Sequence, residues 1–293
     1  MFIATIAKEI PLPPDQMILL NVVGCILLII GVMTYSRLIR RVNRDGGHVR
    51  SELLGLPDIL VAVTLAVLLG LLLLLQWFAP ETAHAHSAGE SPPHEIKGIH
   101  VIYGALQFAL PVLAILALLI GRNISPIDVF GLRRVGFFHA LALAGALLLL
   151  LLPIFLMVTA VAYQFLGEHA EQQELVKVYQ HAAKAGKRDI IWQVAIAAVC
   201  IAPVTEEILF RGYFYPVFKR LLGPLPAAFG TSFLFAAIHN NALGFPGLAL
   251  LALALTLVYE RTGSIIVPIF MHAWFNGANL FFMWWAVQHD FVK

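Results

Sequence analysis

The chain has 293 residues, of which 60% are apolar and only 12% are charged, and its formal net charge at pH 7 is +2. An ordinary soluble domain carries about 25% charged residues, so this composition excludes that class, and the small net charge argues against a nucleic-acid partner. The apolar residues come in blocks of about 20, the length that crosses a hydrocarbon core of about 30 Å. We therefore expect a multi-pass integral membrane protein, in the cell membrane if the source is a bacterium.

Apolar runs separated by charged gaps predict an all-α, polytopic transmembrane helical bundle of about eight spans. The runs lie near residues 17–35, 58–79, 101–120, 138–165, 190–218, 225–241, 244–259 and 264–286. The short runs 225–241 and 244–259 fit either two full spans or a helix pair that dips around a cavity. Glu260 and Arg261, between the last two runs, are expected to form an ordinary pair at the membrane interface.

The orientation follows from lysine and arginine in the short loops, because cytoplasmic loops carry an excess of both. The loop after the first run holds Arg37, Arg40, Arg41, Arg44 and Arg50. The loop after the third run holds three more arginines, whereas the loop 80–99 has only Lys97. This asymmetry places the N-terminus outside and the first and third loops in the cytoplasm. The second loop and its end carry His84, His86, His94 and His100. Their spacing matches no tight metal-ligand pattern, so we interpret the loop as solvated.

The fourth loop divides the chain into three parts. Residues 1–167 are N-terminal transmembrane helices of unassigned role, and residues 190–286 are the part that carries chemistry. Between them, residues 168–189 predict an amphipathic helix lying at the membrane interface. The apolar side of that helix would consist of Leu175, Val176, Tyr179 and Ala182.

The fifth run carries two acids and an arginine, Glu206, Glu207 and Arg211, and no other charged residue between 190 and 218. One ionisable group at bilayer depth costs roughly 2.5–3.5 kcal/mol, so three in one span need a reason. Glu207 and Arg211 have the i,i+4 spacing of a helical ion pair. Glu206 lies about 100° round the helix, which leaves it free to act as a general base. Pro203, one turn earlier, predicts a kink that admits water near Glu206.

Two later runs each carry a histidine, His239 and His272, at similar apparent depth. A neutral imidazole can bind a metal or hydrogen-bond a water. Asn276 follows His272 by one helical turn, and its amide can donate to a developing oxyanion. Phe235, one turn before His239, is expected to pack against that imidazole. An acid, two histidines and an amide on three helices are the parts of a hydrolase; the alternative is a buried polar cluster that only locks helices together.

Three motifs in this order resemble those of the CPBP family of intramembrane proteases. They are Glu206-Glu207-x-x-x-Arg211, Phe235-x-x-x-His239 and His272-x-x-x-Asn276. The family includes the type II CAAX prenyl proteases (the Rce1-like enzymes) and the bacterial proteins similar to lysostaphin resistance protein A. The resemblance covers about residues 190–285. It implies an α-helical membrane hydrolase whose site lies within the bilayer and whose substrate is a protein or peptide at the membrane.

The resemblance also implies a role for each motif residue. Glu206 would activate water, with His239 beside it, and His272 and Asn276 would orient the substrate carbonyl or stabilise the oxyanion. Family members are classed as metalloproteases, and a zinc ion held by Glu206, His239 and His272 is one version of the mechanism. The other version is a metal-free reaction that depends on the glutamate. The spacing does not decide between them, since the sequence has no His-Glu-x-x-His pair.

Glu207 and Arg211 would hold the site together in either version of the mechanism.

Two hypotheses compete with the peptidase. One is a non-catalytic membrane scaffold or chaperone of the same fold, and the other is a proton-coupled transporter that uses Glu206 and the histidines as a relay. No internal repeat is visible, which counts against the inverted-repeat transporters. The order and spacing of the three motifs favour the peptidase, and they leave open whether its substrate is prenylated.

Overall fold

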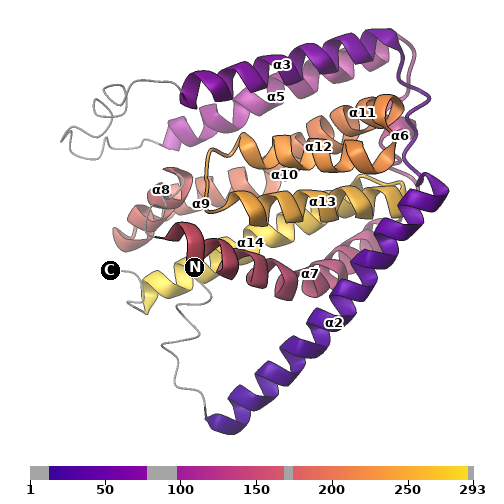
Figure 1. The fold of residues 1–293 in the computed structure, drawn as a ribbon. Coiled ribbons are helices and arrows are strands. Elements are labelled where there is room, and N and C mark those ends of the chain that lie inside the picture. The colour runs from indigo at the N-terminus through magenta and orange to yellow at the C-terminus, as the bar shows by residue number, and fades with distance from the viewer. Residues whose placement is uncertain (1–12, 78–97, 168–173, 290–293) are drawn as a thin grey trace.

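The computed structural model describes residues 13–77, 98–167 and 174–289 (Figure 1). Throughout these residues the regular structure is helical, which confirms the all-α prediction. The helices are α2 Pro14–Asp45, α3 Leu56–Trp77, α5 Gly98–Gly121, α6 Pro126–Val129, α7 Phe137–Leu166, α8 Glu174–Lys184, α9 Arg188–Ile196, α10 Ala202–Glu207, α11 Tyr215–Leu222, α12 Pro224–Ala237, α13 Phe245–Thr262 and α14 Ile266–Gln288. Two π-helical segments, η2 Ala197–Ile201 and η3 Ile208–Phe214, flank α10.

Six helical segments in the described part of the chain are long and apolar enough to cross a membrane, which confirms a multi-pass membrane protein. They are α2, α3, α7, the continuous segment Arg188–Leu222, α13 and α14. The other two expected spans fall on α5, where Ala109–Gly121 counts as a shorter apolar helix, and on α12. With 14 residues, α12 is about 21 Å long, less than the roughly 30 Å of a hydrocarbon core. Eight full spans are therefore not shown.

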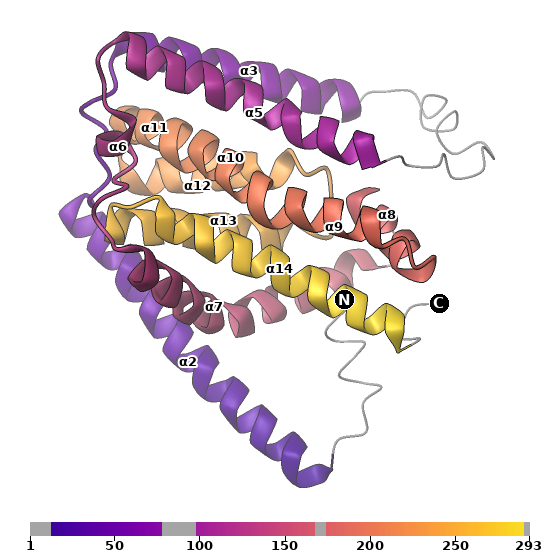
Figure 2. The same ribbon diagram turned by 180° about the vertical axis from the view of Figure 1, so that it is seen from behind.

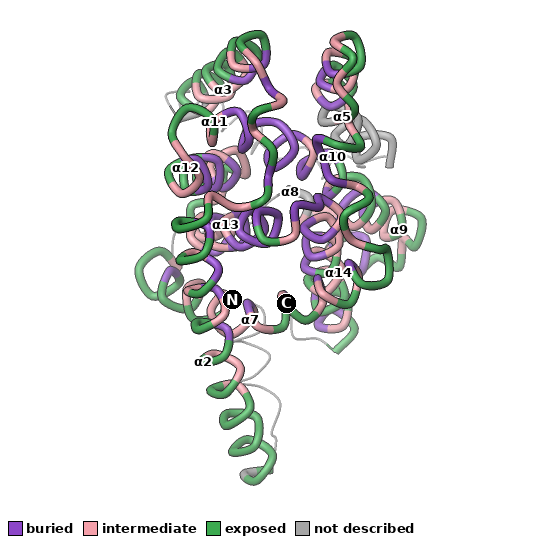
Figure 3. Tube along the Cα trace, turned by 90° about the vertical axis from the view of Figure 1, so that its right-hand side faces the viewer, coloured by how far each residue is buried: buried purple, intermediate pink, exposed green. Residues whose placement is uncertain are grey.

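Helix α13 forms the centre of the bundle. Its apolar window is 61% buried, against 6% for α2, and it packs against α2, α7, α12 and α14. Alanines at 249, 252 and 254 are buried on it, and small residues of this kind let membrane helices approach closely. Gly31 of α2 has the same effect, because a Cβ there would collide with the Leu150 carbonyl of α7. Figure 3 shows the buried segments gathered along α10 and α13.

The outer helices lie on opposite sides of this centre. Helices α3 and α5 are on one side of α10–α12 and α2 is on the other, as Figures 1 and 2 both show. The C-terminal half of α2 packs on α7 and α13 through Tyr35, Leu38 and Val42. Its N-terminal half leaves the bundle, and its apolar side chains are exposed. Exposed apolar helix faces of this length are what a lipid bilayer covers.

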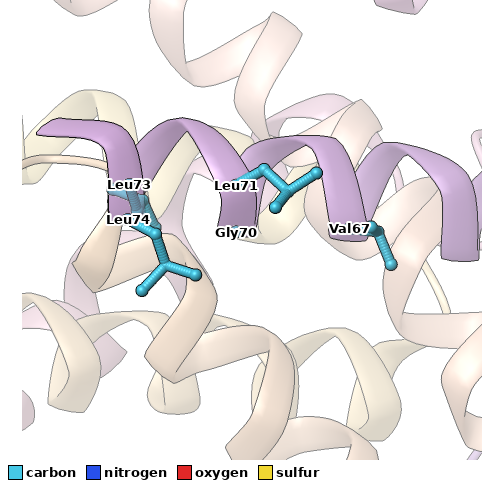
Figure 4. Close-up of a pocket in the computed structure, with 5 residues that line it drawn as sticks. All are labelled: Val67, Gly70, Leu71, Leu73 and Leu74. Carbon is cyan, nitrogen blue, oxygen red and sulfur yellow. The ribbon is translucent and has the colours of Figure 1, made fainter.

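A recess of about 530 Å³ lies beside α3 (Figure 4). It is lined by Val67, Gly70, Leu71, Leu73 and Leu74. Its lining contains no acid, histidine or amide, and none of the residues that sequence analysis singled out contributes to it. The recess therefore belongs to the apolar surface of α3 and is separate from the candidate site.

Helix α8 occupies part of the segment predicted to lie at the membrane interface. Its buried face includes Tyr179, which packs with Val194 of the α9 helix and Met283 of α14. The face thus contacts neighbouring helices. Residues 168–173 of the predicted segment lie outside the described residues, as do His84, His86 and His94 of the second loop.

The loop between α2 and α3 is fixed by three basic side chains from other elements. Arg134 Nη1 donates to the His48 carbonyl over 2.9 Å, and Lys219 Nζ donates to the Val49 carbonyl over 2.9 Å. Arg220 donates to the Leu54 carbonyl. One of these side chains, Arg134, comes from a loop, and the other two come from α11.

The expected pair between Glu260 and Arg261 is wrong. Glu260 is fully buried and binds Lys219 Nζ at 2.6 Å, the Tyr215 hydroxyl at 2.5 Å and the Val49 amide at 3.0 Å. Consecutive residues on a helix point about 100° apart, so Glu260 faces the bundle whereas Arg261 is exposed. Sequence analysis missed this cluster because each partner is distant in the chain.

Candidate active site

The backbone of the fifth predicted span is not a uniform α-helix. Two π-helical segments, η2 and η3, interrupt it on either side of α10. Such segments are rare and occur frequently at functional sites. In η2 the Ala202 amide donates to the carbonyl of Ala197, five residues earlier. The distortion predicted at Pro203 is thus a widened turn immediately before that proline, which lacks an amide hydrogen.

Asn276 of α14 satisfies a carbonyl that this widened turn leaves open. In the i to i+5 register of η2, the partner of the Ala198 carbonyl would be the nitrogen of Pro203, which has no hydrogen to donate. Asn276 Nδ2 donates to that carbonyl over 2.8 Å. The amide of Asn276 therefore ties α14 to the backbone that carries the two glutamates, a role that sequence analysis did not foresee. Its second amide hydrogen remains for another acceptor.

Glu207 and Arg211 form the predicted ion pair, with 2.9 Å between Oε1 and Nη1. Both are almost fully buried, at 0% and 2% exposed. Arg211 also donates to the Ala252 carbonyl over 3.1 Å, and its guanidinium lies 4.6 Å from the centre of the Phe235 ring. A buried pair needs such additional contacts, because desolvating two charges can cost more than their attraction returns. The pair connects η3, α12 and α13.

His272 lies between the two glutamates. Its Nδ1 is 2.9 Å from Oε1 of Glu207, and its Nε2 is 3.9 Å from Oε2 of Glu206. Since a carboxylate only accepts, we assign the Nδ1 hydrogen to the bond with Glu207, which leaves a lone pair on Nε2. That lone pair faces Glu206.

Glu206 is the acid of the pair that makes no hydrogen bond to the described residues. It is 7% exposed, and its Oε2 is buried with no hydrogen bond from the described part of the chain. Leaving a buried acceptor unsatisfied costs about 1–3 kcal/mol, and more for a charged group. The 3.9 Å to His272 Nε2 is too long for a direct hydrogen bond and suits a bridging water. The Oε2 of Glu207 is likewise buried without a hydrogen bond in the described residues, but Oε1 of Glu207 forms an ion pair with Arg211. The neighbouring glutamates therefore differ in that Arg211 neutralises Glu207.

His239 does not lie on a membrane-spanning helix, contrary to expectation. Helix α12 ends at Ala237, and His239 sits in the following turn, where Asn240 has a φ of 45°. Its Nδ1 is 2.7 Å from the Phe235 carbonyl, so we assign the hydrogen to Nδ1 and the lone pair to Nε2. The Phe235 ring contacts both imidazoles, with centroids 4.7 Å from His239 and 5.9 Å from His272. Phe235 packs against His239 as predicted.

The donor chemistry of Glu206, His239 and His272 fits a divalent metal ion. Both histidines use Nδ1 for a carbonyl or carboxylate, as metal-binding histidines usually do. A glutamate with two histidines is also a zinc ligand set. Within the residues that the structure describes, however, no three such side chains are close enough together to hold an ion. The same three groups equally suit a bound water.

The candidate site lies within a part of the chain that matches a known protein family. Residues 188–278 match the family model of the type II CAAX prenyl endopeptidase Rce1-like proteins. This stretch is an Rce1-like domain. The domain runs from the start of α9 into α14, and it includes every motif residue named above. Membership of this protease family implies an intramembrane protease. No curated protein and no solved structure matches the chain.

Replacing Asn276 tests its tie between α14 and η2. Asn276→Ala would leave the Ala198 carbonyl without its donor, so we expect a loss of about 1–3 kcal/mol in unfolding free energy and slower peptide cleavage. Thermal unfolding and initial rates measure the two effects. Asn279→Ala is the matched control, because Asn279 donates only within its own helix, to Phe275. Equal unfolding of the two variants would show that the Asn276 bond does not stabilise the Rce1-like domain.

Proposed function

We propose that the Rce1-like domain hydrolyses a peptide bond at or within the membrane, using a water activated by Glu206. The observation that supports this most directly is the buried, unsatisfied Oε2 of Glu206 beside the free Nε2 of His272. It occurs in a domain of a protease family. A carboxylate that is desolvated but not neutralised by an arginine is suited to take a proton.

In the reaction we propose, Glu206 accepts a proton from the water while the oxygen attacks the carbonyl carbon of the substrate. His272 Nε2 accepts a hydrogen bond from the other hydrogen of this water and so fixes the position of the water. The free amide hydrogen of Asn276 donates to the tetrahedral oxyanion. When the intermediate collapses, the C–N bond breaks and Glu206 returns its proton to the leaving amine. His239 lies against the same phenylalanine ring, and the lone pair on its Nε2 accepts a hydrogen bond within the site.

Glu207 and Arg211 are positioning residues in this proposal. Glu207 holds the Nδ1 hydrogen of His272, so that Nε2 keeps its lone pair toward Glu206. Arg211 neutralises Glu207 and leaves Glu206 as the acid that can change its protonation state. When bound at Glu206, His239 and His272, a zinc ion would supply Lewis-acid polarisation of the water or carbonyl.

The environment of Glu206 also bears on the competing hypotheses. A purely structural cluster, as in a scaffold, is expected to neutralise both acids, whereas here Arg211 and His272 both bind Oε1 of Glu207. In the described part of the chain the Oε2 atoms of both glutamates are buried without a hydrogen bond. A proton relay would use the same histidines, so only experiment separates the transporter from the protease.

The proposal includes an eight-span topology, in which α5 and α12 complete the bundle around the site.

The protease is tested with purified protein in liposomes and a diverse peptide library that contains prenylated and unprenylated members. We expect cleavage, read by mass spectrometry, without any pH gradient across the liposomes. Parallel samples with a chelator, and with zinc restored afterwards, determine whether a metal is required. A well-folded protein that moves protons or solutes and cleaves no peptide would support the transporter instead. Comparing the cleaved members shows whether prenylation matters.

A further inference from the structure

A polar pocket lies where α2 and α13 end, and none of the candidate active-site residues lines it. It has a volume of about 280 Å³. It is lined by Arg41, Val42, Arg44, Asp45, Gly47, His48, Glu260 and Arg261. Three elements meet there: the C-terminal end of α2, the loop that follows it, and the C-terminal end of α13. Its size is just below the roughly 300–1,000 Å³ of pockets for drug-sized ligands, which suits a small head group.

The acids of this pocket are already engaged. Asp45 binds the neighbouring Arg44, with 2.7 Å between Oδ1 and Nε, and Glu260 is held by Lys219. By contrast, Arg41 and Arg261 are exposed and make no ion pair or hydrogen bond within the described part of the chain. They come from different helices and face one pocket. Asp45 also attracts Arg41 electrostatically, but its carboxylate is bonded to Arg44. Two guanidinium groups that form no ion pair at one site point to an anion, since guanidinium binds phosphate oxygens in a bidentate manner.

His48 is a further polar side chain of this pocket. Its Nδ1 contacts the Glu260 carbonyl at 3.0 Å, and its backbone amide donates to the same carbonyl over 2.9 Å. The imidazole is thereby held at the wall of the pocket, and its Nε2 can donate to a phosphate oxygen in the doubly protonated form of the ring. The loop that carries His48 is held by Arg134 and Lys219, which donate hydrogen bonds to the carbonyls of His48 and Val49. The pocket is therefore built on a rigid loop.

The position of the pocket favours a lipid as the source of the anion. It lies where two membrane-spanning helices end, at the expected depth of lipid head groups. On its membrane side, α2 leaves the bundle (Figure 1). The apolar residues exposed on that part of α2 include Ile26, Ile29, Ile30, Val32 and Met33. A phospholipid could place its head group in the pocket and its acyl chains along this helix. Free phosphate would contact only the charged side chains and would leave the apolar face of α2 uncovered.

We propose that the pocket between Arg41 and Arg261 binds the phosphate of an anionic phospholipid head group. Basic pockets between transmembrane helices bind such head groups in general. The lipid would join α2 to α13, and would thereby hold the outer helix against the centre of the bundle. The proposal is independent of the peptidase reaction, because none of the pocket residues belongs to the site of Glu206.

The test is thermal unfolding of the whole protein in neutral phosphatidylcholine micelles, titrated with phosphatidylglycerol. We expect the wild type to be stabilised by phosphatidylglycerol and not by added phosphatidylcholine or inorganic phosphate. Arg41→Gln/Arg261→Gln is expected to weaken the apparent affinity about 30-fold, and each single variant about 5-fold. Both arginines are exposed, so these variants should fold.

The matched control is Arg40→Gln/Arg133→Gln, which removes the same charge from exposed positions at the same end of the bundle. This variant is expected to keep the response of the wild type. An equal loss of affinity in both double variants would overturn the proposal in favour of diffuse surface charge. An equal response to inorganic phosphate would identify a free-phosphate site, and no response to phosphatidylglycerol would exclude the lipid site.

Discussion

Glu206→Gln is expected to reduce peptide cleavage by about 10²–10⁴-fold, the range that a general base contributes. Glutamine keeps the shape of the side chain, so the amide should fit the same space, but it cannot accept a proton from water. The thermal stability should change little, since within the described part of the chain Glu206 makes no hydrogen bond that the substitution would break. Initial rates on a cleaved peptide, together with melting temperatures of both proteins in the same detergent, measure the two effects.

Glu52→Gln is the control for this experiment, because Glu52 is exposed in the loop after α2 and lies outside the site. It should cleave at the wild-type rate. If Glu206→Gln also cleaved at that rate, Glu206 would not be the base, and the peptidase mechanism proposed for this domain would be wrong. If Glu206→Gln lost activity and unfolded at a lower temperature, the loss of rate would have to be compared with Glu206→Asp.

Glu207→Ala is expected to destabilise the protein by about 3–5 kcal/mol, because it leaves the guanidinium of Arg211 buried without a counter-charge. His272 would lose its Nδ1 partner as well, so cleavage should fall along with stability. Replacing both partners, as in Glu207→Leu/Arg211→Met, should recover much of the stability and none of the activity, because apolar residues of similar volume often replace a buried ion pair at little cost. Unfolding by heat or denaturant in detergent gives the values.

The single variants Glu207→Leu and Arg211→Met, measured beside the wild type and the double variant, complete a double-mutant cycle. We expect the two single changes to be far from additive, as is usual for residues in direct contact. Additive effects would mean that the ion pair seen between Oε1 of Glu207 and Nη1 of Arg211 contributes little to stability. If the double variant cleaved peptide at the wild-type rate, Glu207 would not have the positioning role proposed for it.

The two adjacent glutamates show how one short motif can provide both structure and chemistry. Glu207 binds Arg211 and His272 through Oε1, whereas Glu206 forms no ion pair with an arginine or lysine among the described residues and has a buried Oε2 without a hydrogen bond, as Glu207 also has. Pairs of titratable groups whose environments differ in this way are typical of active sites. Here the difference comes from the helix itself, because adjacent residues face about 100° apart and only Glu207 has the i,i+4 spacing to Arg211.

Local features of the sequence were sufficient to predict the helical class, most of the spans and the Glu207–Arg211 pair. Each of these depends on residues that are neighbours in the chain: the length of an apolar run, or the i,i+4 spacing of a helix. The distortion near Pro203 was predictable for the same reason, because proline lacks an amide hydrogen wherever it occurs. The order of the three motifs likewise indicated the family that residues 188–278 match.

Only the tertiary structure decided which distant groups meet. The sequence could not assign His272 to Glu207 or Asn276 to the Ala198 carbonyl, since their partners are more than 60 residues away. It placed His239 inside a span, although the helix ends two residues earlier, and it paired Glu260 with its neighbour in place of Lys219. The physical reason is the same each time. An apolar pattern fixes how a helix is built, whereas packing between helices determines which of its polar groups are desolvated and must find a partner.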